Sequence, residues 1–252
     1  MFCCIINILI NLGSTMAVEV PSIIVIKKDC STINNNECKL NYIHIKVTDI
    51  KGRAEEMMTI ILDDSWLSRL DEIDKESFIA RSQPTIELLL KLLQEVGDEI
   101  GADFGEFVIS SSAQTVMEDE YTHEKMPLAE LWKEKAKGNP GFDFHTISPQ
   151  ELLFFGEAKY NSSDNAYSRA ITQICKFINK KKHKMELTDL RKINTKVNDS
   201  HLGSNKIGFI AAFSVHNNFD NIFNTILSNK NIKNYNLAKY PELYFIGIEI
   251  CQ

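Results

Sequence analysis

Two largely apolar segments in the middle of the chain, residues 142–147 and 152–160, are separated by only four residues, one of which is a proline. Segments of this length with so short a connection predict two antiparallel strands of one hairpin. Three charged residues interrupt them: Asp143 in the first, and Glu157 and Lys159 in the second. Because a buried charge is costly unless a partner compensates it, these residues constrain both the fold and the chemistry of the chain.

The register of this hairpin predicts which charges meet. With the turn centred near residues 149–150, position 143 lies opposite about 156–157, and facing Cβ atoms of an antiparallel pair are about 5 Å apart. Asp143 and Glu157 would then be adjacent carboxylates, which repel each other unless a cation lies between them. Mg²⁺ suits this position because it binds one or two carboxylates and keeps its other positions for water and phosphate oxygens. Mn²⁺ is the alternative ion.

Lys159 adds a cation to the same face of the strand, because it follows Glu157 by two residues. There it can hold or deprotonate an attacking water, or stabilise the charge that builds on a phosphate. A metal ion would lower the pKa of that water. Phosphodiester hydrolysis needs little more than these parts. The alternative is a structural ion pair between Glu157 and Lys159, with Asp143 as a turn-capping residue.

Two other acid-x-Lys triplets show how much the context matters. They are Glu37-Cys38-Lys39 and Asp49-Ile50-Lys51, and neither has an upstream strand that offers a facing aspartate. Only the triplet that begins at Glu157 combines an apolar strand, a hairpin partner and a following amphipathic helix. The strand context therefore indicates a site more strongly than the acid-x-Lys triplet does.

The remaining periodicities predict an α/β protein, with strands where β-branched or apolar residues cluster and helices where they recur every three to four positions. The expected strands are residues 22–28, 41–48, 128–136, 142–147, 152–160, 207–213 and 243–250. The expected helices are residues 53–70, a helix that begins at Pro84, and residues 100–117, 164–183 and 219–227. We expect residues 1–95 to form an α+β extension with a small sheet of its own, and residues 96–252 to form the core.

This core resembles the PD-(D/E)XK nuclease superfamily. Gly141-Phe142-Asp143 stands where the motif's aspartate belongs, and Glu157-Ala158-Lys159 stands where its ExK belongs. The expected order of helix, three strands, helix and strand is similar to the αβββαβ core of that fold, over roughly residues 95–215. The resemblance implies a restriction-endonuclease-like core, with a central mixed sheet flanked by helices, and a magnesium-dependent endo- or exodeoxyribonuclease.

The resemblance implies further site residues. Glu106, on the helix before the hairpin, would be the acid that completes the metal site with Asp143 and Glu157; a solvated helix glutamate is the alternative. Gln173 lies on the helix after the hairpin, where many members carry a glutamine near the site. A polar residue at the border of an apolar stripe is the alternative for Gln173.

Contacts with DNA are expected from a few cations. Lys180, Lys181 and Lys182 belong to the one dense basic segment of the sequence and could hold a phosphate backbone, as could Arg169. Lysines also suit a helix C-terminus because of the helix dipole, so both interpretations stay open. The net charge of −6 excludes binding by bulk positive charge. DNA would have to be recognised by a local basic patch or with a basic partner.

The segment Ala102-Asp103-Phe104-Gly105-Glu106, together with the Gly-Phe-Asp and Gly-Glu-Ala-Lys strings, is similar to the HamA family. Members of that family are the nuclease subunits of Hachiman anti-phage defence systems. The resemblance implies an ATP-driven helicase partner that restrains the nuclease until foreign or damaged DNA is met. The chain itself has no GxxxxGK phosphate loop. Residues 1–95 are the expected docking surface.

The cysteines and the N-terminus predict the compartment. The six cysteines form no CxxC pair and no zinc-like spacing with histidine, which favours free thiols in a reducing compartment. Residues 2–12 are apolar but too short to span a bilayer and lack a basic flank. We expect a cytoplasmic protein with no membrane partner.

Two functions of other classes stay open beside the nuclease. The first is a catalytically silent PD-(D/E)XK fold that serves as a nucleic-acid-binding or scaffold subunit. The set of Asp143, Glu157 and Lys159 argues against it, because a silent site has no physical reason to keep buried charges. The second is a structural α/β interaction protein in which the triplet is incidental.

Overall fold

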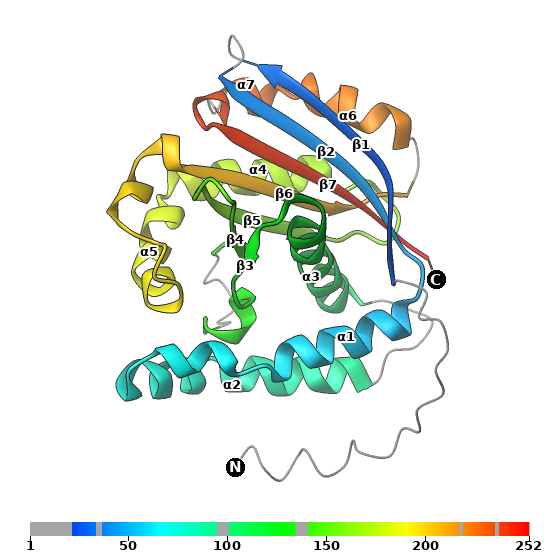
Figure 1. The fold of residues 1–252 in the computed structure, drawn as a ribbon. Coiled ribbons are helices and arrows are strands. Elements are labelled where there is room, and N and C mark those ends of the chain that lie inside the picture. Colours follow the sequence, from blue (N-terminus) through cyan, green and yellow to red (C-terminus); the bar gives the residue numbers. More distant parts are fainter. Residues whose placement is uncertain are drawn as a thin grey trace.

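A seven-stranded mixed sheet forms the centre of the protein, in the strand order β1-β2-β7-β6-β5-β4-β3 (Figure 1). The strands are β1 (Ile23–Ile33), β2 (Cys38–Val47), β3 (Glu124–Lys125), β4 (Phe144–Ile147), β5 (Leu153–Lys159), β6 (Ile207–Ser214) and β7 (Glu242–Ile250). The computed structural model describes residues 22–33, 37–94, 101–134, 141–216, 219–234 and 237–251. The expected α/β class, with a mixed sheet flanked by helices, is confirmed.

The central strands are parallel, and their sequences explain why. Strands β5, β6, β7 and β2 pair in parallel, whereas β1, β4 and β3 are added at the two sides by antiparallel pairing. Every residue of β6 is buried. This continuous apolar run is typical of a parallel strand that helices cover on both faces. Strand β1 alternates between half-buried and exposed residues, as expected for an edge strand with one solvated face.

Helices pack on both faces of the sheet (Figure 1). The α-helices are α1 (Ile50–Leu62), α2 (Glu72–Gln94), α3 (Ala102–Tyr121), α4 (Tyr167–Asn179), α5 (Lys182–Ile193), α6 (Phe219–Leu227) and α7 (Lys230–Asn234). Helices α1 and α3 and the end of α2 share one hydrophobic core with the sheet, and α4, α5 and α6 share the other. In the described parts of the chain, no helix is both long and apolar enough to cross a membrane.

The predicted hairpin is confirmed. Strands β4 and β5 are antiparallel neighbours, with Phe144 opposite Gly156 and Ile147 opposite Leu153. The expected order of helix, three strands, helix and strand is present from α3 to β6, with α5 as an additional helix before β6.

The strand predicted at residues 128–136 is wrong over residues 128–134, and its last two residues lie outside the described part of the chain. The first of the three strands is the short β3, and residues 129–131 form a 3-10 helix, η4 (Ala129–Leu131). Leu128, Leu131 and Trp132 are all buried. Their spacing of three and four residues suits a helical turn, because a strand with one buried face would alternate. The other 3-10 helices are η3 (Ser65–Arg69), η5 (Asp199–Leu202), η6 (Ser204–Lys206) and η7 (Leu237–Lys239).

Three predicted helices have different bounds. The expected helix 164–183 is two helices, α4 and α5, because Lys181 takes the left-handed conformation with φ of 56° and turns the chain between them. The expected helix 53–70 begins earlier and ends at Leu62, where η3 follows. Pro84 lies inside α2 and not in its first turn. Tertiary burial of Phe78 and Leu89 on either side holds α2 together across the proline.

The prediction of a separate N-terminal sheet is also wrong. Strand β2 pairs in parallel with β7 from Lys39 to Val47, so β1 and β2 extend the same sheet that holds the hairpin. The expected boundary between residues 95 and 96 lies outside the described residues. The expected role of residues 1–95 as a docking surface stays a prediction.

Candidate active site

Asp143 directly precedes Phe144, the first paired residue of β4, which lies opposite Gly156 of β5. The Asp143 backbone N–H donates to the Gly156 carbonyl oxygen at 2.8 Å, so Asp143 and Phe144 both lie against Gly156, the residue before Glu157. The side chain then crosses to the neighbouring strand, where Asp143 Oδ2 accepts a hydrogen bond from the Ala158 N–H at 2.7 Å. The two carboxyl groups are close enough for Asp143 to raise the pKa of Glu157.

Glu157 is almost fully buried in the middle of the sheet, with 2% of its surface exposed. Its Oε1 atom forms an ion pair with Lys159 Nζ at 2.8 Å. Its Oε2 atom is buried and has no hydrogen-bond partner among the described residues. A buried carboxylate oxygen without a partner is costly, so this atom is the strongest sign of a ligand at the site.

Helix α3 brings Glu106 to the same place. Glu106 Oε1 lies 3.4 Å from Lys159 Nζ, so the ammonium bridges an acid of α3 and an acid of β5. The preceding residue, Gly105, permits the close approach: a Cβ atom there would lie 2.3 Å from the ring of Tyr160. Glycine therefore sets the distance between the beginning of α3 and the end of β5.

The charges shift one another's pKa values. Burial raises the pKa of Glu157 well above its usual value, and Asp143 raises it further against the opposing effect of Lys159. Burial also raises the pKa of Asp143, while Lys159 lowers it. Burial would lower the pKa of Lys159, but Glu157, Asp143 and Glu106 outweigh burial and raise it. One ammonium thus compensates three carboxyl groups.

The residues present fit a hard divalent cation in part. In the described segments, no group of three or more His, Cys, Asp or Glu side chains is arranged to hold a metal ion. Asp143 and Glu157 supply two carboxylates, and the Ala158 carbonyl oxygen faces the same Lys159 ammonium at 2.7 Å. Oxygen ligands of these kinds are those that Mg²⁺ prefers. Glu106 is joined to Glu157 through Lys159.

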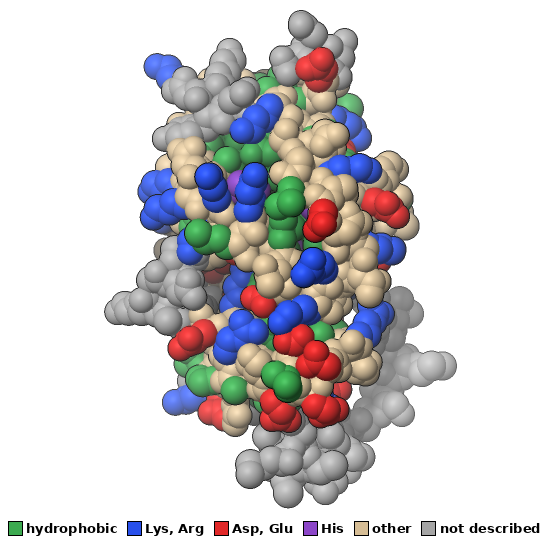
Figure 2. Space-filling model, turned by 90° about the vertical axis from the view of Figure 1, so that its left-hand side faces the viewer, with side chains coloured by type: hydrophobic (Ala, Val, Ile, Leu, Met, Phe, Trp, Pro, Cys, Tyr) green, Lys and Arg blue, Asp and Glu red, His purple; other side chains and the backbone are tan. Residues whose placement is uncertain are grey.

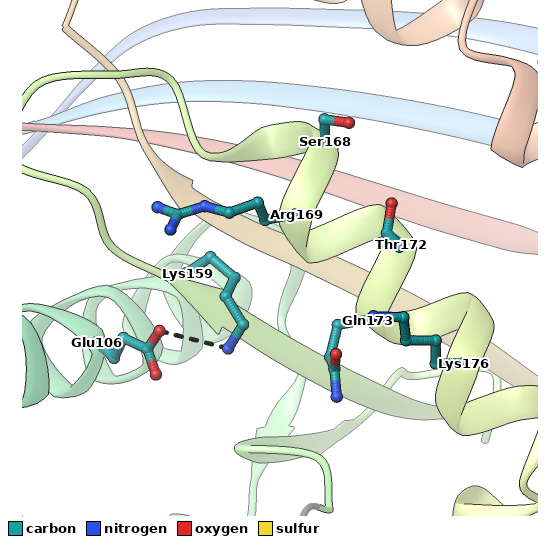
Figure 3. A pocket seen from close by; sticks show the side chains of 7 residues that line it. All are labelled: Glu106, Lys159, Ser168, Arg169, Thr172, Gln173 and Lys176. Atoms are coloured by element: carbon teal, nitrogen blue, oxygen red, sulfur yellow. Dashed lines mark ion pairs between the residues drawn. The ribbon is translucent and has the colours of Figure 1, made fainter.

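A pocket of about 460 Å³ opens beside the acids, between β5 and α4 (Figure 3). It is lined by Glu106, Lys159, Ser168, Arg169, Thr172, Gln173 and Lys176. Gln173 reaches into it from α4 and Lys159 from β5. Arg169 Nη2 donates to the Tyr160 carbonyl oxygen at 2.9 Å, which ties α4 to the end of β5. Three cationic side chains and one carboxylate line the pocket, so it favours an anion.

The predicted cluster of Lys180, Lys181 and Lys182 lies beyond the pocket, where α4 ends and α5 begins. Lys180 follows the end of α4, Lys181 forms the left-handed turn, and Lys182 begins α5. None of the three lines the pocket. Lysine and arginine side chains gather over the upper part of the face shown in Figure 2, and acidic side chains at its lower end, where Figure 1 places η3 and the beginning of α2.

A second charged group, behind the hairpin, was not expected from the sequence. Glu186 of α5 accepts from the Phe142 N–H at 3.0 Å and pairs with Lys133 and His145, each at 2.8 Å. His145 is fully buried. Burial alone would raise the pKa of Glu186, but Lys133 and His145 outweigh burial and lower it to about 2.

One signal in the sequence could have identified Glu186. It shares the buried face of α5 with His183, Leu190 and Ile193, at spacings of three and four residues. An acid on an apolar helical stripe needs a buried partner. The partners themselves come from distant segments and leave no local trace.

Comparison with known proteins assigns no family to this chain. No protein-family model matches the chain, and no curated protein matches it. The resemblance to nucleases stays a prediction that depends on the hairpin and its charges.

Proposed function

We propose that this protein is a metal-dependent DNA nuclease that hydrolyses phosphodiester bonds. The observation that supports the proposal is that Asp143 and the ion pair of Glu157 with Lys159 lie together on the hairpin, at the edge of a pocket whose other wall carries Arg169 and Lys176. Acids that can hold a divalent cation, beside cations that can hold a phosphate, are the parts that phosphodiester hydrolysis needs.

Each residue has a distinct role in this proposal. Asp143 and Glu157 would hold Mg²⁺ or Mn²⁺, and Glu106 would support it from α3. The bound ion supplies charge neutralisation and a lower pKa for the attacking water. Lys159 is positively charged at neutral pH, because its pKa is raised. It therefore acts as a donor that orients water or stabilises charge on the phosphate rather than as a base.

The DNA strand would follow α4. Arg169, Gln173, Lys176 and Lys180 occur at spacings of four, three and four residues, which places them on one side of the helix. Eleven residues of helix span roughly 16 Å, enough for several phosphates of one strand. Lys181 and Lys182 would extend this surface around the turn into α5.

The experiment compares the purified protein with two variants at the site. Linear, circular and single-stranded DNA, and RNA, are incubated with Mg²⁺, Mn²⁺ or chelator. Glu157→Gln removes one metal ligand and Lys159→Met removes the ammonium, and each should lower the cleavage rate by about 10²–10⁴-fold. Chelator should abolish cleavage by the unmodified protein.

A matched control lies on α3. Glu118→Gln removes a carboxylate that pairs with Lys125 away from the site, and should leave cleavage unchanged. Glu106→Gln on the same helix should lower the rate, though less than Glu157→Gln. Cleavage that persists in both Glu157→Gln and Lys159→Met would refute the site.

A catalytically silent scaffold is the second candidate, and one observation favours it. Lys159 already compensates the acids without a metal, through contacts of 2.8 Å with Glu157 and 3.4 Å with Glu106. Calorimetric titration with Mn²⁺ distinguishes the nuclease from the silent scaffold. Binding that Asp143→Asn abolishes supports the nuclease, whereas DNA binding with neither metal binding nor cleavage supports the scaffold.

We further propose that the nuclease acts in the cytoplasm as the effector of an anti-phage defence system and is restrained by a helicase partner. The acidity of the chain supports a need for such a partner, because bulk charge does not draw it to DNA. Co-purification with a helicase encoded beside it, and lower cleavage in the complex than in the free protein, would support restraint. Full activity that the helicase leaves unchanged would argue against it.

A further inference from the structure

The backbone immediately before Asp143 is clamped by side chains from two other segments. The Phe142 N–H donates to Glu186 Oε1 at 3.0 Å, and the Phe142 carbonyl oxygen accepts from Lys133 Nζ at 2.7 Å. Lys133 and Glu186 form an ion pair with each other at 2.8 Å. The peptide groups on both sides of Phe142 are thus fixed by one charged pair.

This clamp is enclosed and closely fitted. Glu186 is buried, and its second oxygen, Oε2, lies 2.8 Å from Nε2 of the fully buried His145. Gly141 permits the approach of Glu186, because a Cβ atom at that position would lie 2.3 Å from Glu186 Oε1. In a site of low dielectric, charge-assisted hydrogen bonds of this kind hold their partners in one geometry.

The peptide group between Phe142 and Asp143 transmits this restraint to Asp143. The carbonyl held by Lys133 belongs to the same peptide unit as the Asp143 N–H, which donates to Gly156. That planar unit therefore has both of its polar groups bonded. Asp143 Oδ2 then accepts from the Ala158 N–H, which sets the carboxyl beside Glu157.

We propose that Glu186 is a positioning residue that, together with Lys133, holds Asp143 in the geometry needed for metal binding. Glu186 does not touch the substrate; it acts through the Phe142 backbone. The inference rests on the proposed nuclease function. It assigns α5 a role in the active site that its place on the far side of the hairpin does not suggest.

The test uses isosteric changes and a matched control. Glu186→Gln keeps the size of the side chain but removes the charge, and Lys133→Met removes the donor to Phe142. Asp189→Asn removes a carboxylate one turn further along α5, where it pairs with Arg81 and does not contact the hairpin. Hydrogen exchange of the Ala158 amide reports the Asp143 contact directly, with the Phe209 amide in β6 as the internal reference for global stability.

We expect Glu186→Gln and Lys133→Met to speed exchange at Ala158 relative to Phe209. Affinity for Mn²⁺ in calorimetry and kcat should each fall about 10–100-fold, the usual effect of losing a residue that orients a metal ligand. KM for DNA should be unchanged because α4 is untouched. Asp189→Asn should match the unmodified protein in each measurement. If Glu186→Gln does not fold, Lys133→Met decides.

The outcomes separate this inference from the proposed function. Unchanged relative exchange at Ala158 in a folded variant overturns the positioning role, whatever the activity. Faster exchange with unchanged Mn²⁺ affinity and unchanged kcat also overturns it. If the unmodified protein neither binds Mn²⁺ nor cleaves DNA, the proposed function fails, and the exchange data still decide whether Glu186 fixes Asp143.

Discussion

At the scale of single residues, buried charge explains the site. Glu157 combines 2% exposure with an oxygen that no described residue bonds, and its pKa is raised. A buried carboxylate of this kind destabilises the fold unless a partner compensates its charge. Lys159 offsets part of the cost, and a divalent cation would offset more. The need to compensate buried charge therefore accounts for the arrangement of these residues around Lys159.

Histidine burial predicts the response of the protein to acid. Burial lowers the pKa of His123 to about 4, from a usual 6.5, and the pKa of His183 likewise. Between these values the unfolded chain binds more protons than the folded chain, so the free energy of unfolding falls as pH falls from about 6.5 to about 4. Protonation of each histidine over this range lowers the free energy of unfolding by on the order of 3 kcal/mol. Urea unfolding at a series of pH values measures this.

The variant His123→Phe separates the contribution of one histidine. Its ring lies among Phe154 and Tyr244, so phenylalanine should fit, although the hydrogen bond with Thr146 is lost. Stability between pH 4 and 6.5 should depend less on pH, by about one proton. Tyr121→Phe is the control, because that hydroxyl does not titrate in this range. An equally steep dependence in His123→Phe would contradict the assignment.

The contacts within the site differ in how far apart their residues lie in the sequence, and this decides which of them could be predicted. Asp143, Glu157 and Lys159 were predictable because a hairpin register is local and links residues a few positions from one turn. The contacts of Glu186 were not, because its partners His145 and Phe142 are separated from it by 41 and 44 residues. Such contacts form only when α5 packs behind the hairpin.

At the scale of elements, α4 is the part of the proposed site with the clearest physical test. Its cations line the pocket on the side that faces Lys159, and each that contacts a phosphate releases bound counterions. Lys176→Gln should therefore weaken DNA binding and reduce the slope of log K against log salt by about 1. Fluorescence anisotropy at several salt concentrations measures the slope.

The control for this prediction is Lys206→Gln. Lys206 precedes β6, whose other end pairs with Lys159 through Phe213, so it lies at the opposite end of the parallel strands. Its loss should leave the slope unchanged. Equal effects of the two substitutions would show that binding follows net charge rather than a surface on α4.

Element bounds were harder to predict than element types. The hairpin, β6, α6 and β7 were expected from apolar patterns close to their actual bounds. Residues 128–136 were mistaken for a strand because Leu131 and Trp132 suit strands by composition, whereas the burial spacing is helical. The end of α4 was missed because lysine at 181 has no sequence preference for its left-handed conformation.

At the scale of the whole molecule, the sheet joins the two halves of the sequence. Nine residues of β2 pair with β7, and Ile43, Ile45 and Val47 belong to the same core as α3. A fragment of residues 96–252 would expose β7 as a long apolar edge. We expect it to aggregate or to lack cooperative unfolding in calorimetry, whereas residues 22–252 should unfold in one transition.

The opposite outcome is informative. A fragment 96–252 that unfolds cooperatively and cleaves DNA would show that the first 95 residues are an appendage, as the sequence predicts. Cleavage by residues 22–252 is the reference for that comparison.

The sequence by itself determined the hairpin, its register and the three charges that meet there, because strand periodicity and a short turn act over a few residues. It also determined the α/β class, through a buried apolar strand that alternates with amphipathic helices. Only the tertiary structure decided that β1 and β2 complete the same sheet, and that Glu186 and Lys133 hold the backbone beside Asp143. Those contacts join segments far apart in the chain, and their free energy appears only when the helices and the sheet pack together.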